Sequence, residues 1–248
     1  MGRMPAPRAR NADALTPAGR PCHARRMFAD AAAFLRALEA QVVAQENDDP
    51  PPGQPNQLRL QIAFPDRASM EKFVRYGQIA VAEFGRACLV TYLGWPIPHL
   101  YYDPVPQDYE AAYRRHVLGR MLPERAHDAV LQGRNVDHVF PRTTALRNRI
   151  GYVLLLPCDA AANKSAGGGV ERRQSFDWNR SPRPYGADWS TLAKFGGLPA
   201  PSIARGTDLS AEAARLTRLL AGRFPTVMDT PQTRIMVETF LKWTRDKV

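Results

Sequence analysis

The sequence predicts an α+β protein that is mostly helical, with a small hairpin-and-helix unit embedded between N-terminal and C-terminal helices. Apolar residues recur at helical spacing over long stretches on both sides of the middle of the chain. In the middle, residues 135–140 have an alternating pattern and residues 151–156 form a continuous apolar run, and both patterns are typical of strands. With 248 residues, 44% of them hydrophobic, the chain can bury a sizeable core in one domain.

The region before this unit is predicted to be helical. The expected elements are a helix at 27–45, a linker at 46–55, a short strand near 58–62, a long helix from Asp66 to about Cys88, a break at 94–98, a helix from Gln107 or Asp108 to Met121, and one or two further turns at 123–131. The long helix depends on the spacing of Met70, Phe73, Val81 and Cys88. His116 and His127 fall within expected helices, where packing or surface roles are favoured over metal ligation.

The chain is expected to divide into four regions. They are a disordered basic arm at 1–26, a helical N-terminal region at 27–133, a core unit at 134–168, and a region at 169–248 that forms one compact domain with the core. The last region should hold two amphipathic helices. One carries Leu209 to Leu220 and ends before Pro225, and the other begins at Thr230-Pro231, where a capping residue precedes a proline.

The net charge of +10 favours a polyanionic partner, and nucleic acid is the first expectation. A membrane surface is the competing partner, and a solvated basic face in an arginine-rich chain is the structural alternative. No run of 18 apolar residues is present, so no membrane-spanning helix is expected.

Three cysteines, Cys22, Cys88 and Cys158, are far apart in the sequence. Their spacing excludes a Cys-x-x-Cys zinc knuckle and makes a disulfide framework improbable. We therefore expect a reducing compartment and a cytoplasmic protein. The first 26 residues lack the apolar segment of a secretory signal.

The pair Asp137-His138 is the strongest chemical signal in the chain. Hydrolysis of a phosphodiester needs an attacking water, a base for its proton, and positive charge on the phosphate. A carboxylate binds a hard divalent cation, and a neutral imidazole is a base near physiological pH. Adjacent residues of a regular strand point to opposite faces, so both side chains reach one site only if a bend or bulge precedes Pro141.

The residues after this pair predict a hairpin followed by a helix. Residues 142–149 are polar and are expected to form the connecting loop. The strand at 151–156 should end at Pro157, and Cys158 or Asp159 should cap a short helix that carries Asn163 and ends at the glycines 167–169. The amide oxygen of Asn163 is a second hard ligand, and Asn is alternatively a common helix C-cap residue.

Together these residues resemble the ββα-metal core of the HNH endonuclease superfamily. The motifs are Asp-His-Val-x-Pro at 137–141, the apolar strand, and Asn-Lys-Ser at 163–165. The similar variant occurs in the HNH domains of CRISPR nucleases and in restriction enzymes that act on modified DNA. The resemblance spans about residues 134–168. It implies a DNA endonuclease with His138 as general base and Asp137 and Asn163 as ligands of Mg²⁺ or another divalent cation such as Mn²⁺.

One position departs from the family pattern. The family has an asparagine before the apolar pair of the second strand, where it braces the loop that carries the histidine. Tyr152 stands at that position here, and Asn148 is the residue that could replace it. A nucleic-acid-binding protein with a degenerate HNH core is therefore the alternative function. A toxin or defence effector is a further one, and a salt bridge at a strand end is the structural alternative for Asp137-His138.

Several basic and aromatic residues are candidates for DNA contacts. The segment 170–185 interleaves arginines with aromatic residues, a composition that suits phosphate pairing and base stacking, although a loop whose aromatics fill the core has the same composition. The DNA-binding candidates are Arg142, Lys164, Arg172, Arg173, Trp178 and Arg180. The partner is expected to be DNA, with RNA as an alternative. A single core makes one cut, so the expected assemblies are a nicking monomer, a homodimer or part of a larger defence complex.

Overall fold

The computed structural model describes residues 27–46, 60–74, 79–92, 94–105, 108–168, 184–187, 189–198, 200–224 and 230–246. The basic arm expected at 1–26 and the linker beyond residue 46 lie outside these ranges, as do residues 169–183 of the basic and aromatic segment. Among the described residues, none of the helices combines the length and the apolar composition of a membrane span.

A seven-stranded antiparallel sheet forms the centre of the fold. Its strands are β1 (Gln61–Phe64), β2 (Ile79–Phe84), β3 (Ala87–Tyr92), β4 (His99–Tyr102), β5 (Arg134–His138), β6 (Tyr152–Asp159) and β7 (Tyr185–Gly186). The strand order is β2-β3-β4-β6-β1-β7, and β5 pairs with β6. The α+β prediction is confirmed in this coarse form, but the sheet is much larger than the hairpin and single short strand expected.

Strand β6 organises the sheet because both of its edges are paired. Leu155 lies opposite Leu100 of β4 and also opposite His138 of β5, so β4 and β5 occupy different edges of β6. Near the start of β6, Val153 lies opposite Tyr102 of β4 and also opposite Ala63 of β1, so β1 too lies on the edge of β6 away from β4. The strand that carries His138 is therefore held against the most central strand of the molecule.

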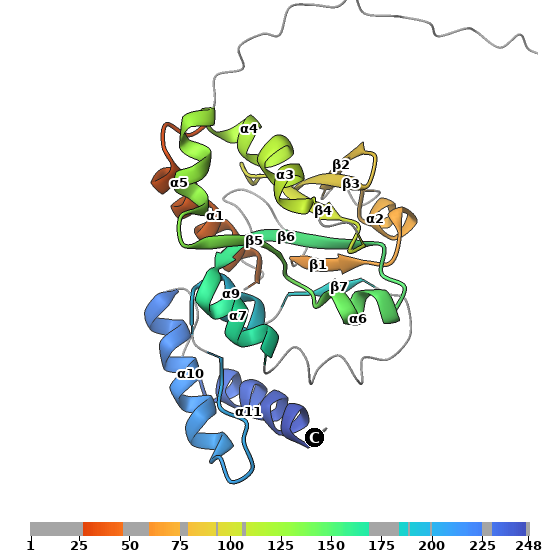
Figure 1. The fold of residues 1–248 in the computed structure, drawn as a ribbon. Coiled ribbons are helices and arrows are strands. Elements are labelled where there is room, and N and C mark those ends of the chain that lie inside the picture. The colour runs from red at the N-terminus through yellow and green to blue at the C-terminus, as the bar shows by residue number, and fades with distance from the viewer. Residues whose placement is uncertain are drawn as a thin grey trace, which may run out of the picture.

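Helices cover both sides of the β5–β6 pair. The described helices are α1 (Ala31–Glu46), α2 (Arg67–Val74), α3 (Tyr109–Tyr113), a π-helical segment (Arg114–Leu118), α4 (Gly119–Met121), a 3₁₀ turn (Glu124–Ala126), α5 (His127–Leu131), α6 (Arg142–Arg147), α7 (Ala160–Gly168), α9 (Trp189–Phe195), α10 (Leu209–Arg223) and α11 (Pro231–Arg245). Figure 1 shows α3, α4 and α5 on one side of β5 and β6, and α7 and α9 on the other side, with α10 and α11 farther out.

The predicted helices with clear capping residues are confirmed. The side chain of Asp208 accepts hydrogen bonds from the first backbone amides of α10, and Thr230 does the same for α11, which has Pro231 at its first position. Asp30 caps α1 by accepting from the Ala33 amide at 2.8 Å. Unpaired amide groups at a helix start need such acceptors, so these boundaries are encoded locally.

The prediction of one long helix from Asp66 to Cys88 is wrong. Helix α2 ends at Val74, and β2 and β3 follow as a hairpin. Gly85 has a positive φ of 62°, and Gly85-Arg86 forms the two-residue turn between Phe84 and Ala87. Glycine at the first position of a two-residue loop is a hairpin signal. The apolar residues of β2 and of the largely buried β3 also fit helical spacing, which explains the wrong prediction.

Two details of the central unit also differ from the prediction. The loop expected at 142–149 contains the helix α6. Strand β6 continues through Pro157 to Asp159, although Pro157 was expected to end it. The amide of Val139 donates to the Leu154 carbonyl, so by alternation the nitrogen of Pro157 faces the β4 edge, where pairing stops at Leu155. The missing N–H of this proline therefore breaks no ladder hydrogen bond.

The apolar core has two parts. The larger one joins the sheet to α1, to the helices between 109 and 131, and to α9. The smaller one lies between α10 and α11 and includes Leu216 and Leu241. Arg223 of α10 makes a bidentate ion pair with Glu39 of α1, with both N–O distances at 2.6 Å, so α10 is tied to the larger part.

Candidate functional site

Strand β5 positions Asp137 and His138 without a bend. All five residues of β5 pair with β6 in continuous register, from Arg134 opposite Asp159 to His138 opposite Leu155. The bend or bulge that would turn both side chains toward one point is not present. Adjacent side chains on a regular strand diverge, and these two do so.

His138 faces α3 and is buried, with an exposed fraction of 5%. Its ring packs edge-on against Tyr109, with the ring centroids 4.7 Å apart, and it is hydrogen bonded to the backbone at Asp103. The Nε2 atom is buried and has no hydrogen-bond partner. Burial lowers the pKa of His138 to about 4, a shift that Asp137 opposes and that Arg142 and Lys194 reinforce. The imidazole is therefore neutral at physiological pH.

Asp137 faces α9 and forms an ion pair with Lys194. The side chain of Lys194 is 4% exposed and that of Asp137 is 22% exposed, so the pair is largely shielded from water. The ammonium of Lys194 also donates to the His138 carbonyl oxygen at 3.2 Å. Lys194 thus contacts both residues of the motif, one through its side chain and the other through its backbone.

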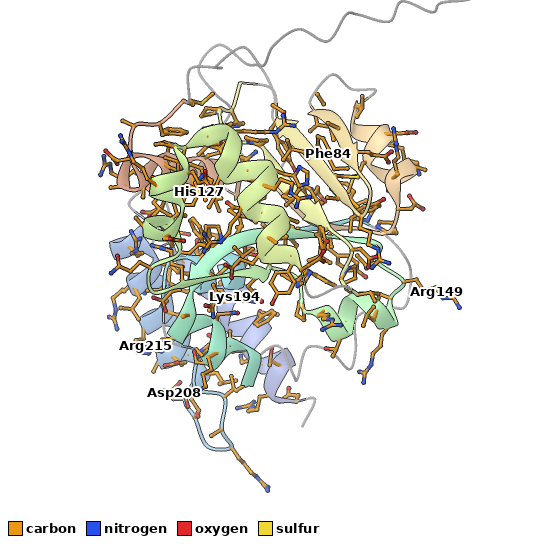
Figure 2. All side chains as sticks on the ribbon, turned by 45° about the horizontal axis from the view of Figure 1, so that its top comes forward. Phe84, His127, Arg149, Lys194, Asp208 and Arg215 are labelled. Atoms are coloured by element: carbon orange, nitrogen blue, oxygen red, sulfur yellow. The ribbon has the colours of Figure 1, made fainter. Side chains whose placement is uncertain are left out.

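The two sides of β5 therefore have different chemistry. The imidazole of His138 contacts α3, whereas the carboxylate of Asp137 contacts α9, and these helices lie on opposite sides of the β5–β6 pair (Figure 1). Figure 2 places Lys194 in the interior of the molecule, while Arg149 projects from its edge.

Asn163 lies on α7, on the same side of the β5–β6 pair as Lys194. Asp159 caps this helix by accepting from the Ala162 amide at 2.8 Å, and α7 packs against β5, β6 and α9. Asn163 is half-buried. Within the described ranges, no hydrogen bond joins it to Asp137 or His138. The structure therefore brings the strand and the helix of the motif together, with no hydrogen bond described between the two proposed metal ligands.

The hydrogen bonds described for the two residues expected to brace His138 go to other partners. The hydroxyl of Tyr152 is hydrogen bonded to the thiol of Cys88 on β3. Asn148 is buried at the end of α6, where its backbone amide donates to the Thr144 carbonyl. The described contacts of the imidazole are with the Tyr109 ring and with the backbone at Asp103.

The structure places two of the expected DNA-contacting residues on its surface. Arg142 is exposed at the start of α6 and donates to the Val105 carbonyl at 2.9 Å. Lys164 is exposed on α7. Arg172, Arg173, Trp178 and Arg180 lie outside the described residues. Of the two helical histidines, His116 has a packing role, stacked on Phe84 with ring centroids 4.6 Å apart.

Lys194 is the residue that sequence reasoning missed. Gly196 and Gly197, which follow it after Phe195, form the turn that ends α9. A Cβ on Gly196 would lie 2.5 Å from the Phe224 ring, and a Cβ on Gly197, which has a φ of 75°, would lie 3.2 Å from the Cβ of Asp159. Helix α9 is thereby docked closely against its neighbours, with Lys194 directed to Asp137.

The described residues contain no group of three His, Cys, Asp or Glu side chains that could hold a metal. Asp137 and Asn163 carry oxygen donors of the kind that a hard divalent cation takes, and α7, which carries Asn163, packs against β5. Searches of protein-family models, of curated proteins and of solved structures found no match for the chain.

Proposed function

We propose that this protein is a metal-dependent endonuclease that hydrolyses phosphodiester bonds in DNA. The observation that carries the proposal is the order of the central unit. Asp137-His138 lies at the end of β5, β5 pairs with β6, and α7 follows at once with Asn163. This is the order that the resemblance to HNH endonucleases implies. The net charge of +10 supports a polyanionic substrate.

In this proposal Asp137 and His138 act on one phosphate, so the end of β5 must bend when DNA binds, because the two side chains lie on opposite sides of the regular strand. Asp137 and Asn163 would hold one divalent cation, Mg²⁺ or Mn²⁺, which when bound supplies positive charge to the phosphate oxygens and the leaving group. His138 would take the proton of the attacking water at Nε2, which is neutral and has no partner within the protein. Because His138 is buried under Tyr109, that ring must move aside when DNA binds.

A second candidate function is nucleic-acid binding without cleavage. Two observations favour it. Asp137 is paired with Lys194, and the imidazole of His138 lies on the other side of β5. Such a protein would be a degenerate HNH core whose net positive charge favours nucleic acid.

Cleavage of supercoiled plasmid DNA separates the two candidates. The wild-type protein should nick the plasmid with Mg²⁺ and lose this activity with a chelator. His138→Ala should keep DNA binding and lose cleavage by at least about two orders of magnitude, because it lacks the base. Full cleavage by His138→Ala would remove His138 from the mechanism. DNA binding without any cleavage by the wild-type protein would favour the second candidate.

A further inference from the structure

The buried ion pair of Asp137 and Lys194 has a consequence for the proposed metal site. Asp137 is the charged member of the proposed ligand set, since the amide of Asn163 is neutral. The ammonium of Lys194 already pairs with this carboxylate in a position that is 4% exposed. A divalent cation on Asp137 would therefore bind next to a fixed positive charge.

The position of Lys194 is built into the fold. Helix α9 packs against β6 and α7. The turn after Lys194 leaves no room at Gly196, where the Phe224 ring approaches, and little at Gly197, where Asp159 approaches. The hydrogen bond from Lys194 to the His138 carbonyl adds a second fixed contact. Withdrawing the ammonium from Asp137 thus costs packing as well as charge pairing.

We infer that Lys194 is an internal counter-ion that competes with the divalent cation for the Asp137 carboxylate. This inference rests on the proposed function, because it assigns Asp137 to the metal. It makes Lys194 a positioning residue, which holds the end of β5 and lowers the affinity of the site for metal until nucleic-acid phosphates add negative charge.

Mn²⁺ binding in the absence of DNA tests the inference directly. The titration is followed by electron paramagnetic resonance, which needs no enzymatic activity. Lys194→Gln removes the charge and keeps a hydrogen-bonding side chain, so it should bind Mn²⁺ about tenfold more tightly than wild type. Adding Asp137→Asn to that variant should abolish the gain. Lys242→Gln is the matched control, because it frees Glu238 from a lysine on the surface helix α11, and it should leave the affinity unchanged.

The outcomes separate this inference from the proposed function. If Lys194→Gln binds Mn²⁺ no more tightly than wild type, while Asp137→Asn weakens wild-type binding, the competition is overturned and the metal site remains. If Asp137→Asn has no effect on Mn²⁺ binding, both are overturned.

Lys194→Arg provides a second test if Lys194→Gln does not fold by circular dichroism. It keeps the positive charge and can pair bidentately with Asp137, so it should bind Mn²⁺ no more tightly than wild type. Tighter binding by this variant would overturn the inference.

Discussion

Two histidines of this protein are buried in different surroundings, and the comparison shows which feature marks a candidate site. His99 of β4 is 1% exposed, and His138 of β5 is 5% exposed. Each has one ring nitrogen that is buried without a hydrogen-bond partner. Burial lowers both pKa values, to about 3 for His99 and to about 4 for His138.

Their neighbours differ in charge. His99 lies among neutral groups, with its Nε2 atom 2.7 Å from the Gln45 side chain and 3.3 Å from that of Gln41, and with Tyr92 packed edge-on against its ring. The pKa of His138, in contrast, responds to Asp137, Arg142 and Lys194 as well as to burial. Burial and a low pKa are therefore shared by a structural histidine and a candidate base, and the charged surroundings set the second apart.

Matched substitutions of the two histidines test this distinction and should give the largest effect. His138→Gln should reduce Mg²⁺-dependent DNA cleavage by at least about two orders of magnitude, because the amide is not a base. His99→Gln should leave cleavage close to wild type. Single-turnover cleavage of a labelled duplex measures both. Equal losses in the two variants would mean that the surroundings do not distinguish the histidines.

The charged neighbours can be tested by their effect on stability. Asp137→Asn leaves the ammonium of Lys194 buried without its carboxylate, and we expect a loss of about 3 kcal/mol in the free energy of unfolding. Glu110→Gln breaks an exposed pair with Arg114, and it should cost about 0.5 kcal/mol or less. Urea denaturation measures both. A small effect of Asp137→Asn would show that the buried pair contributes little to the site.

The pH dependence of stability should reflect both histidines. Because folding lowers their pKa values from 6.5, the unfolded state binds more protons below about pH 6.5. Their contribution to stability is complete above that pH and is lost as the pH falls toward 4. Each histidine adds at most about 1.4 kcal/mol per pH unit to the slope. His99→Gln and His138→Gln should each reduce the dependence of the melting temperature on pH between pH 7 and 5. An unchanged dependence would contradict the buried neutral state of the histidine.

The smallest effect is expected at the turn that positions Lys194. Gly197→Ala places a Cβ at a positive φ and 3.2 Å from Asp159, so it should cost about 1 kcal/mol of stability. Gly222→Ala is the control, because this helical glycine has open space around it, and it should be neutral or slightly stabilising. A stability of Gly197→Ala equal to wild type would show that the turn tolerates displacement of α9.

The sequence predicted those parts of the fold that local signals specify. The Thr230-Pro231 start of α11 and the order of β5, β6 and α7 follow from residues that are close in the chain. The hairpin of β2 and β3 was missed because its apolar residues also fit helical spacing, so that the Gly85-Arg86 turn was the one distinguishing signal.

The candidate site was predictable in its motif but not in its surroundings. Asp137, His138 and Asn163 lie within 27 positions of one another, and their spacing indicated a hairpin and a helix. Lys194 is a single lysine without a motif, and only the docking of α9 brings it to Asp137. The divergence of Asp137 and His138 depends on whether β5 stays regular, which its pairing with β6 decides.

A crystal structure of the protein soaked in Mn²⁺, with the ion located by its anomalous scattering, would test the central claim most directly. We predict one ion bound by the Asp137 carboxylate and the Asn163 amide oxygen, with Lys194 displaced from its ion pair or sharing the carboxylate. An undisturbed Asp137–Lys194 pair with no ion on Asp137 at saturating Mn²⁺ would contradict it.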